Sequence, residues 1–246
     1  MSEILRRYRD QVVRVIDHVA ANQVGAFEAA RDAVAAALEA DRLIYVAGSG
    51  HSHLIAEEAF FRAGGIAAAQ AILDPDLMLH VSASRSSQLE REEGQAESVL
   101  AAYEIARGDV VFVVSNSGRN AYPVEMALAA KTRGATTIAI TSLLHTRSVT
   151  SRHSSGQRLF EVCDLVLDNG ADYGDASLSV GSGGLRMGPT STIGGVFLVN
   201  ALMAAAVAHL GDRGIAIDVY QSANAQGSEG AAEALVERWK PRIRGL

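Results

Sequence analysis

The chain has 246 residues, of which 48% are hydrophobic and 20% are charged, and this is the composition of an ordinary globular protein. It excludes disordered, collagen-like and coiled-coil classes. The 28 acidic and 22 basic residues give a net charge of -6, which offers no general electrostatic footprint for nucleic acid or for an anionic membrane. The sequence therefore favours a small molecule or a protein as partner, and it predicts no binding to nucleic acid or membrane.

The cysteine content and the N-terminus indicate the compartment. The single cysteine, Cys163, cannot form an intrachain disulfide, and the arginine-rich N-terminus has no apolar signal-peptide core. Both features favour the reducing cytoplasm. The uncharged run 193–208 contains Asn200 and lacks an aromatic belt or a basic flank, so we expect a buried core helix there.

Apolar residues recur at helical spacing in the first 40 residues and predict two helices. One stripe covers residues 4–19, the other covers residues 27–38, and Gly25 lies between them. Such a pair is typical of an antiparallel helical hairpin, which we expect over residues 1–40.

From residue 41 onward, short apolar runs alternate with longer helical stretches. The predicted strands are residues 43–47, 66–73, 110–114, 136–141 and 165–167. The predicted helices between them are residues 53–63, 95–106 and 121–133. This βαβ alternation predicts parallel strands joined by right-handed crossovers. We expect a single domain over residues 1–246, with an α/β core at 41–210 and a C-terminal tail at 211–246.

Two polar loops follow predicted strands, and each leads into a predicted helix. Ligands of a doubly wound sheet bind at the carboxyl ends of its strands, where helix N-termini favour anions. The loops are Gly48-Ser49-Gly50-His51-Ser52 and Ser115-Asn116-Ser117-Gly118-Arg119-Asn120. Two neighbouring loops of this kind can converge on one phosphate, with neutral hydroxyl and amide donors only.

Several other site types are excluded by the sequence. The third glycine of a dinucleotide fingerprint is replaced by His53, and neither a P-loop nor a G-x-S-x-G motif occurs. None of the seven histidines has the spacing of a metal motif. We therefore expect no metal and no cofactor, and we expect chemistry on a part of the ligand other than its phosphate.

The two loops resemble those of the sugar isomerase, or SIS, domain family. The resemblance covers residues 43–210 and is carried by the βα spacing together with the motifs Ser115-x-Ser117-Gly118-x-Asn120 and Gly48-x-Gly50-x-Ser52. The chain resembles most a stand-alone branch that is related to phosphosugar isomerases and the muramic acid phosphate etherase. The segments that carry this resemblance are residues 48–65, 86–94, 145–156 and 222–224. The resemblance implies a three-layer, flavodoxin-like, doubly wound sheet of about five parallel strands that binds a phosphorylated sugar.

The resemblance also implies which residues contact the phosphate. They are Ser52, Ser115, Asn116, Ser117 and Asn120, beside the further loop hydroxyl of Ser49. The family usually has Thr or Ser where this chain has Asn120, whose amide can also donate a hydrogen bond. The Gly-, Ser- and Asp-rich segment 170–190 is similar to the family's lid, and after it Ser191 or Thr192 lines the site or caps the next helix.

Candidate acid/base groups lie on the helix after the first loop. The family's usual glutamate corresponds to Glu57 or Glu58, and the spacing favours Glu58. Adjacent residues point about 100 degrees apart on a helix, so only one of the two faces the site. Glu93 is similar to a second glutamate of the etherase. His51 and His145 are further candidates, because imidazole titrates near neutrality.

Three functions remain open from the sequence. The first is an aldose-ketose or amino-sugar phosphate isomerase that uses a glutamate as acid/base. The others are an etherase-type lyase and a non-catalytic phosphosugar sensor. The apolar stripe of residues 4–19 has no sheet face to cover, so we expect a homodimer with the helical hairpin in or beside the interface.

Overall fold

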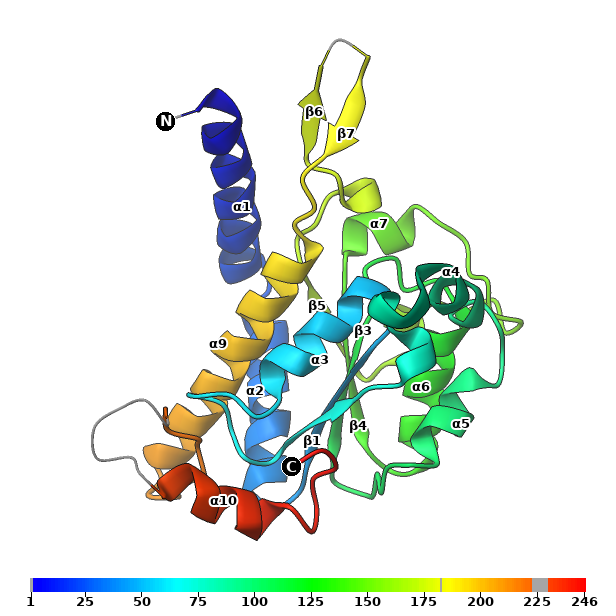
Figure 1. Ribbon diagram of the computed structural model, residues 1–246. Helices are drawn as coiled ribbons and strands as arrows, with labels where there is room; N and C mark the ends of the chain where they lie inside the picture. The colour runs from blue at the N-terminus through cyan, green and yellow to red at the C-terminus, as the bar shows by residue number, and fades with distance from the viewer. Residues whose placement is uncertain (1, 182, 223–229) are drawn as a thin grey trace.

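The computed structural model describes residues 2–181, 183–222 and 230–246, and a five-stranded parallel sheet lies at its centre (Figure 1). The strand order is β2-β1-β3-β4-β5. The strands are β1 (Ile44–Gly48), β2 (Ala69–Ile72), β3 (Val110–Val114), β4 (Thr136–Thr141) and β5 (Leu165–Asp168). The expected sheet is confirmed, and β3 and β4 have the predicted bounds.

Helices cover both faces of the sheet, which explains why its central strands are continuous apolar runs (Figure 1). On one face lie α2 (Val24–Glu39), α3 (His53–Ala59) and α9 (Ser191–Gly211). On the other lie α5 (Gln95–Leu100), α6 (Ala121–Thr132) and α8 (Leu159–Val162). The three-layer α/β architecture is therefore confirmed.

Some helices differ from their predicted bounds. The helix α3 ends at Ala59, because Phe60 is extended and Phe61 has a φ of 38°. The helix α4 (Leu79–Leu89) was not predicted, since its serine-rich sequence has no clear apolar stripe and its backbone is non-helical at Ser82. Four further short elements are η1 (Gly50–Ser52), η2 (Pro75–Leu77), α7 (Leu143–Arg147) and α10 (Ala231–Trp239).

The two N-terminal helices are present, but the expected antiparallel hairpin is wrong. Gln23 alone joins α1 (Glu3–Asn22) to α2, whereas a reversal between packed helices needs a loop of about 2–5 residues. Both helices instead run one after the other along α9 (Figure 1). Val15 and Val19 are buried in the second half of α1, while the first half extends beyond the sheet.

The glycine-rich segment 170–190 contains ordered elements. It forms η3 (Tyr173–Asp175) and an antiparallel pair, β6 (Leu178–Val180) and β7 (Leu185–Met187). This β6–β7 hairpin projects from the body beside α1 (Figure 1). The Arg7 guanidinium donates to the Ser179 carbonyl at 2.7 Å, and the Tyr8 hydroxyl donates to the Pro189 carbonyl at 2.6 Å. These bonds dock the segment on α1.

Of the helices in the described ranges, α9 alone is long and apolar enough to cross a membrane by length and composition. It packs against α1, α2 and α3, and Leu198, Leu202 and Leu210 are buried in these contacts. Its glycines bring it close to its neighbours, since a Cβ at Gly194 or Gly195 would overlap Asn169 or Ile55. These are the contacts of a core helix, as the sequence predicted.

Candidate functional site

The register of the sheet brings the two polar loops together. Strands β1 and β3 are neighbours, and Gly48 at the end of β1 pairs with Val114 at the end of β3. The loops therefore leave the same edge of the sheet side by side. One continues through η1 into α3, and the other leads directly into α6.

The first loop is a tight turn that only glycine permits at its start. A Cβ on Gly48 would lie 2.6 Å from the carbonyl carbon and oxygen of Ser52, because the chain folds back over the strand end. The Ser52 N–H donates to the Ser49 carbonyl at 3.0 Å, and His53 Nδ1 contacts the Gly50 carbonyl. No hydrogen bond occupies the hydroxyl of Ser49 or Ser52 within the described residues, so both can serve a ligand.

Internal hydrogen bonds also shape the second loop. The Gly118 N–H donates to Ser115 Oγ at 3.2 Å, and Gly118 has a φ of 57°. The Asn169 amide donates to Asn116 Oδ1 at 3.0 Å. Ser115 and Asn116 thus hold the loop's shape. The half-buried Ser117 hydroxyl has no partner in the described part of the chain, so it is the freest donor of the loop.

Asn120 is oriented by an arginine from a distant segment. It precedes α6 and makes no side-chain capping bond. Its Oδ1 accepts a hydrogen bond from Arg152 Nη1 at 2.9 Å, which turns the amide so that the NH2 group remains available to donate. The Arg152 N–H donates to the Arg119 carbonyl at 2.7 Å, so the arginine is fixed to the same loop.

Positive charge gathers beside the second loop, although the sequence predicted neutral donors only. Arg119 lies within the loop, and its buried Nε has no hydrogen-bond partner among the described residues. Burial, followed by the charges of Arg119 and Arg91, lowers the pKa of the Arg152 guanidinium. Crowded cations of this kind are stabilised by an anion. The local motif gave no signal for Arg152, because that residue comes from a loop after the next strand.

His145 lies on α7 after β4, where the charge of Arg119 acts on it. Its buried Nδ1 has no partner in the part of the chain that the structure describes, and its ring centroid is 4.8 Å from that of Tyr173. Burial, and then the charge of Arg119, lower the pKa of the imidazole, which is therefore neutral at pH 7. His51 is exposed on η1. Of these two candidates, His145 is thus half-buried and His51 is exposed.

The structure distinguishes the two glutamates of α3. Glu58 accepts a hydrogen bond from Asn200 Nδ2 at 2.8 Å and pairs with Arg62, so its carboxylate faces α9. The Glu57 side chain is 48% exposed, and its Oε1 lies 3.6 Å from Nε2 of His53. His53 in turn contacts the first loop. The carboxylate associated with the loop is therefore that of Glu57.

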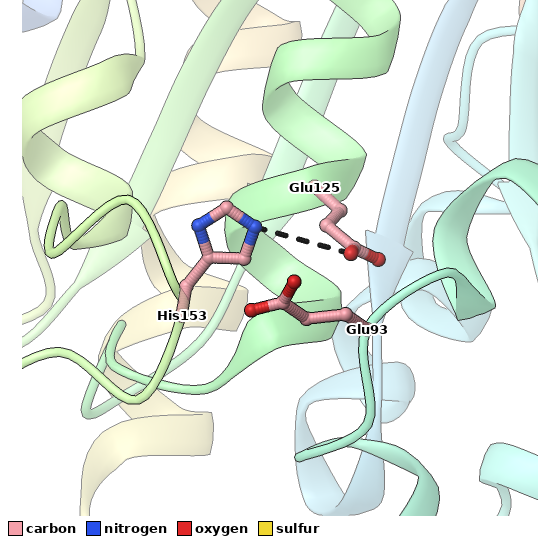
Figure 2. A group of neighbouring side chains, drawn as sticks. All are labelled: Glu93, Glu125 and His153. Carbon is pink, nitrogen blue, oxygen red and sulfur yellow. Dashed lines mark ion pairs between the residues drawn. The ribbon is translucent and has the colours of Figure 1, made fainter.

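Glu93 belongs to a cluster with Glu125 and His153 (Figure 2). The N–H and hydroxyl of Ser154 donate to its carboxylate at 2.7 and 3.0 Å, and these bonds lower the pKa of Glu93. The Gly94 N–H donates to the Glu125 carboxylate. The sequence did not bring these three residues together, since they come from three separate segments.

Ser191 is the first residue of α9 rather than its cap. Its hydroxyl donates to Asp175 Oδ2 at 2.6 Å, and the N–H groups of Thr190 and Ser191 donate to Asp175 Oδ1. Asp175 thus satisfies the first turn of α9. Thr192 is half-buried in the same turn. Residues 223 and 224, in one of the segments that carried the resemblance, lie outside the described residues.

The chain is similar to known proteins in sequence and in fold. The family model of the SIS domain matches residues 7–142. A UPF0309 protein of Shouchella clausii is 39% identical over 240 residues, which cover 97% of this chain and 98% of the relative.

Two solved structures are similar in fold. Phosphoheptose isomerase GmhA from Neisseria gonorrhoeae has a TM-score of 0.56 at 18% identity, covering 83% of this chain and 97% of that chain. The NanR protein of Vibrio vulnificus, complexed with ManNAc-6P, has a TM-score of 0.56 at 16% identity, covering 98% of this chain and 70% of that chain.

Proposed function

Because the chain belongs to the SIS domain family, we propose that it binds a phosphorylated sugar between its two polar loops and isomerises that sugar. The observation that carries the proposal is the pairing of Gly48 with Val114, which sets the loops side by side. Two proteins of similar fold support the ligand class, since one is a phosphoheptose isomerase and the other was solved with ManNAc-6P.

The phosphate is held by neutral donors, with positive charge beside them. The hydroxyls of Ser49, Ser52 and Ser117 have no partner within the described residues and can donate, and Arg152 orients the amide of Asn120 for donation. The guanidinium groups of Arg119 and Arg152 attract the phosphate at long range, which neutral donors cannot do. Such a set positions a phosphomonoester and leaves its P–O bonds intact.

Isomerisation requires a base that moves one proton between adjacent carbons. The Glu57 carboxylate removes the proton from C2 of the open-chain aldose, the C–H electron pair forms the C1=C2 bond, and the carbonyl oxygen takes a proton. Return of the proton from Glu57 to C1, with loss of the O2 proton, gives the ketose. A neutral His145 can carry the proton between O1 and O2, because its lowered pKa keeps it unprotonated at pH 7.

The experiment is proton exchange in deuterated water with a panel of phosphosugars that includes hexose, 2-amino and N-acetylamino 6-phosphates. We expect exchange at C1 or C2 of one panel member. Glu57→Gln abolishes exchange without weakening binding, while Glu58→Gln retains exchange because its carboxylate faces α9. The matched pair occupies adjacent positions of one helix, so it separates chemistry from helix stability.

The outcomes distinguish the three functions. Binding of a phosphosugar with neither exchange nor turnover contradicts an isomerase and indicates a sensor. Release of a 3-substituent, with loss of activity in Glu93→Gln, indicates an etherase-type lyase. Failure to bind any phosphosugar contradicts the proposal altogether.

We also propose that the protein acts in the cytoplasm as a homodimer. The free Cys163 is consistent with a reducing compartment. The dimer is argued below from the apolar surface of α1 and of the β6–β7 hairpin.

A further inference from the structure

Three segments far apart in the sequence place two carboxylates and an imidazole at one point (Figure 2). Glu93 lies before α5, Glu125 lies on α6, and His153 lies in the loop that follows α7. One potential ligand atom from each lies within 4.8 Å of the other two. Figure 2 shows all three side chains directed toward a common centre.

The cluster carries negative charge that it does not neutralise itself. Among the described residues, the one ion pair to either carboxylate comes from His153, whose Nε2 is 3.9 Å from Glu125 Oε1. The side chains of His153 and Glu125 are 11% and 17% exposed, so water screens this pair only in part. Two carboxylates this close repel each other, which leaves an imbalance of negative charge. A bound cation would neutralise the excess negative charge of Glu93 and Glu125.

Hydrogen bonds fix the carboxylates and leave lone pairs free. The N–H and hydroxyl of Ser154 donate to Glu93, one to each oxygen, and the N–H of Gly94 is shared by the two oxygens of Glu125. A carboxylate oxygen accepts two hydrogen bonds, so each retains one lone pair. The donors therefore orient the two groups without exhausting them.

The imidazole of His153 is oriented in the same way. Its Nδ1 lies 2.7 Å from Ser155 Oγ. When Nδ1–H donates to that hydroxyl, the lone pair of Nε2 faces the carboxylates, as in metal sites where an outer hydrogen bond selects the histidine tautomer. The Ser155 N–H, 3.3 Å from Nδ1, favours the opposite tautomer, so cation binding has to select the first.

We propose that Glu93, Glu125 and Nε2 of His153 bind one divalent cation of the zinc class, with a fourth position left to water. Two carboxylates and an imidazole suit such a metal, whereas Ca²⁺ and Mg²⁺ prefer oxygen ligands alone. Bonds of about 2.0–2.2 Å to a tetrahedral ion place the ligand atoms about 3.4 Å apart, so the cluster contracts by roughly 1 Å. The exposed Glu93 side chain provides this movement most readily.

The proposed site does not depend on the proposed function. At this site, one ion would bind ligands from the turn before α5, from the helix α6 and from the loop of His153. Arg152, the residue before His153, donates to Asn120, so the cation also restrains the segment that orients this amide.

The test is a titration of untagged protein, first stripped with chelator and desalted, with Zn²⁺ followed by calorimetry. We expect one saturable site per chain and a rise in Tm on saturation. The double variant Glu125→Gln/His153→Gln lowers the affinity by at least tenfold. Glu92→Gln is the matched control: Glu92 adjoins Glu93, but its carboxylate accepts from Gln88 at 2.7 Å outside the cluster, so this variant binds as the wild type does.

A second measurement keeps the test decisive if the double variant is destabilised. Co²⁺ in the wild type gives a visible absorption band that reports the nitrogen ligand, and His153→Gln alone shifts or removes it while Glu92→Gln does not. The proposal is overturned if the wild type shows no saturable Zn²⁺ binding. It is equally overturned if one-site binding persists undiminished in the double variant.

Discussion

At the scale of single residues, the site depends on side chains whose partners are distant in the sequence. Asn120 occupies a position where the family usually has Thr or Ser, and the loop alone does not explain the amide. The structure does, because Arg152 binds its oxygen and leaves its nitrogen to donate. A motif identifies the residues of the loop, but not the arginine that orients one of them.

The two glutamates of α3 show a similar limit. Helical geometry predicted that only one of them faces the site, and in the structure the two carboxylates have different partners. Which one it is depends on Asn200 and Arg62, which bind Glu58. Asn200 lies on α9, far along the chain, so spacing within α3 could not decide between the two.

His145 leads to a prediction for the pH dependence of stability. Its folded-state pKa lies below the ordinary value of about 6.5, owing to burial and then Arg119, against the opposing effect of Asp175. As the pH falls below about 6.5, the unfolded chain therefore takes up a proton at this residue before the folded chain does, and stability decreases. This loss continues down to the folded-state pKa and then stops.

The variant His145→Asn removes this contribution. We expect its free energy of unfolding, measured by urea denaturation at a series of pH values, to fall less steeply below pH 6.5 than that of the wild type. Above pH 7 the two dependences should be parallel. Equal slopes below pH 6.5 would show that His145 takes up its proton equally well in the folded chain.

At the scale of elements, the strands were the most predictable part of the fold. The bounds of β3 and β4 were predicted because buried strands of a covered sheet are unbroken apolar runs between polar loops. The helix α3 was predicted too long, since the break at Phe60 and Phe61 has no glycine or proline to mark it. Local sequence does not predict a helix end that depends on tertiary contacts.

The first loop gives a prediction for Gly48→Ala. The added Cβ would overlap the backbone of Ser52, which cannot yield as a flexible side chain would. We expect a loss of about 1–3 kcal/mol in the free energy of unfolding, together with weaker phosphosugar binding. The control is Gly25→Ala in α2, where a Cβ meets nothing within 4 Å and where Ala is expected to stabilise the helix by about 0.5–1 kcal/mol. Equal stabilities of Gly48→Ala and wild type in chemical denaturation would refute this account of the loop.

At the scale of the whole molecule, the first half of α1 and the β6–β7 hairpin form a projection (Figure 1) that exposes several apolar side chains. Its exposed side chains include Ile4, Leu5, Leu185 and Met187. The sequence predicted the apolar stripe, but not the hairpin beside it. The arrangement depends on how α1 runs along α9, which residues 1–40 alone do not determine. Exposed apolar area on this scale favours burial against a second copy of the chain.

The dimer prediction is tested by Leu5→Glu combined with Met187→Glu. Burial of two unpaired carboxylates in an apolar interface is costly, so we expect the dimer to dissociate. The control is Leu128→Glu, which changes an exposed leucine of α6 away from the projection. Light scattering coupled to size exclusion measures the mass. A monomeric wild type, or a double variant that remains as dimeric as the control, contradicts the prediction.

The central claim is that the paired loops hold the phosphate of a phosphorylated sugar, and the affinity of Ser117→Ala tests it most directly. Ser117 makes no hydrogen bond in the described chain, so its loss leaves the loop intact. Calorimetry should show the phosphosugar bound about 1.5–3 kcal/mol more weakly, the value of a hydrogen bond to a charged group, with the unphosphorylated sugar unaffected. Ser148→Ala, which removes an exposed hydroxyl bonded to Leu144 on α7, should change neither affinity. Equal phosphosugar affinities for Ser117→Ala and wild type, or an equal loss for both sugars, would contradict the claim.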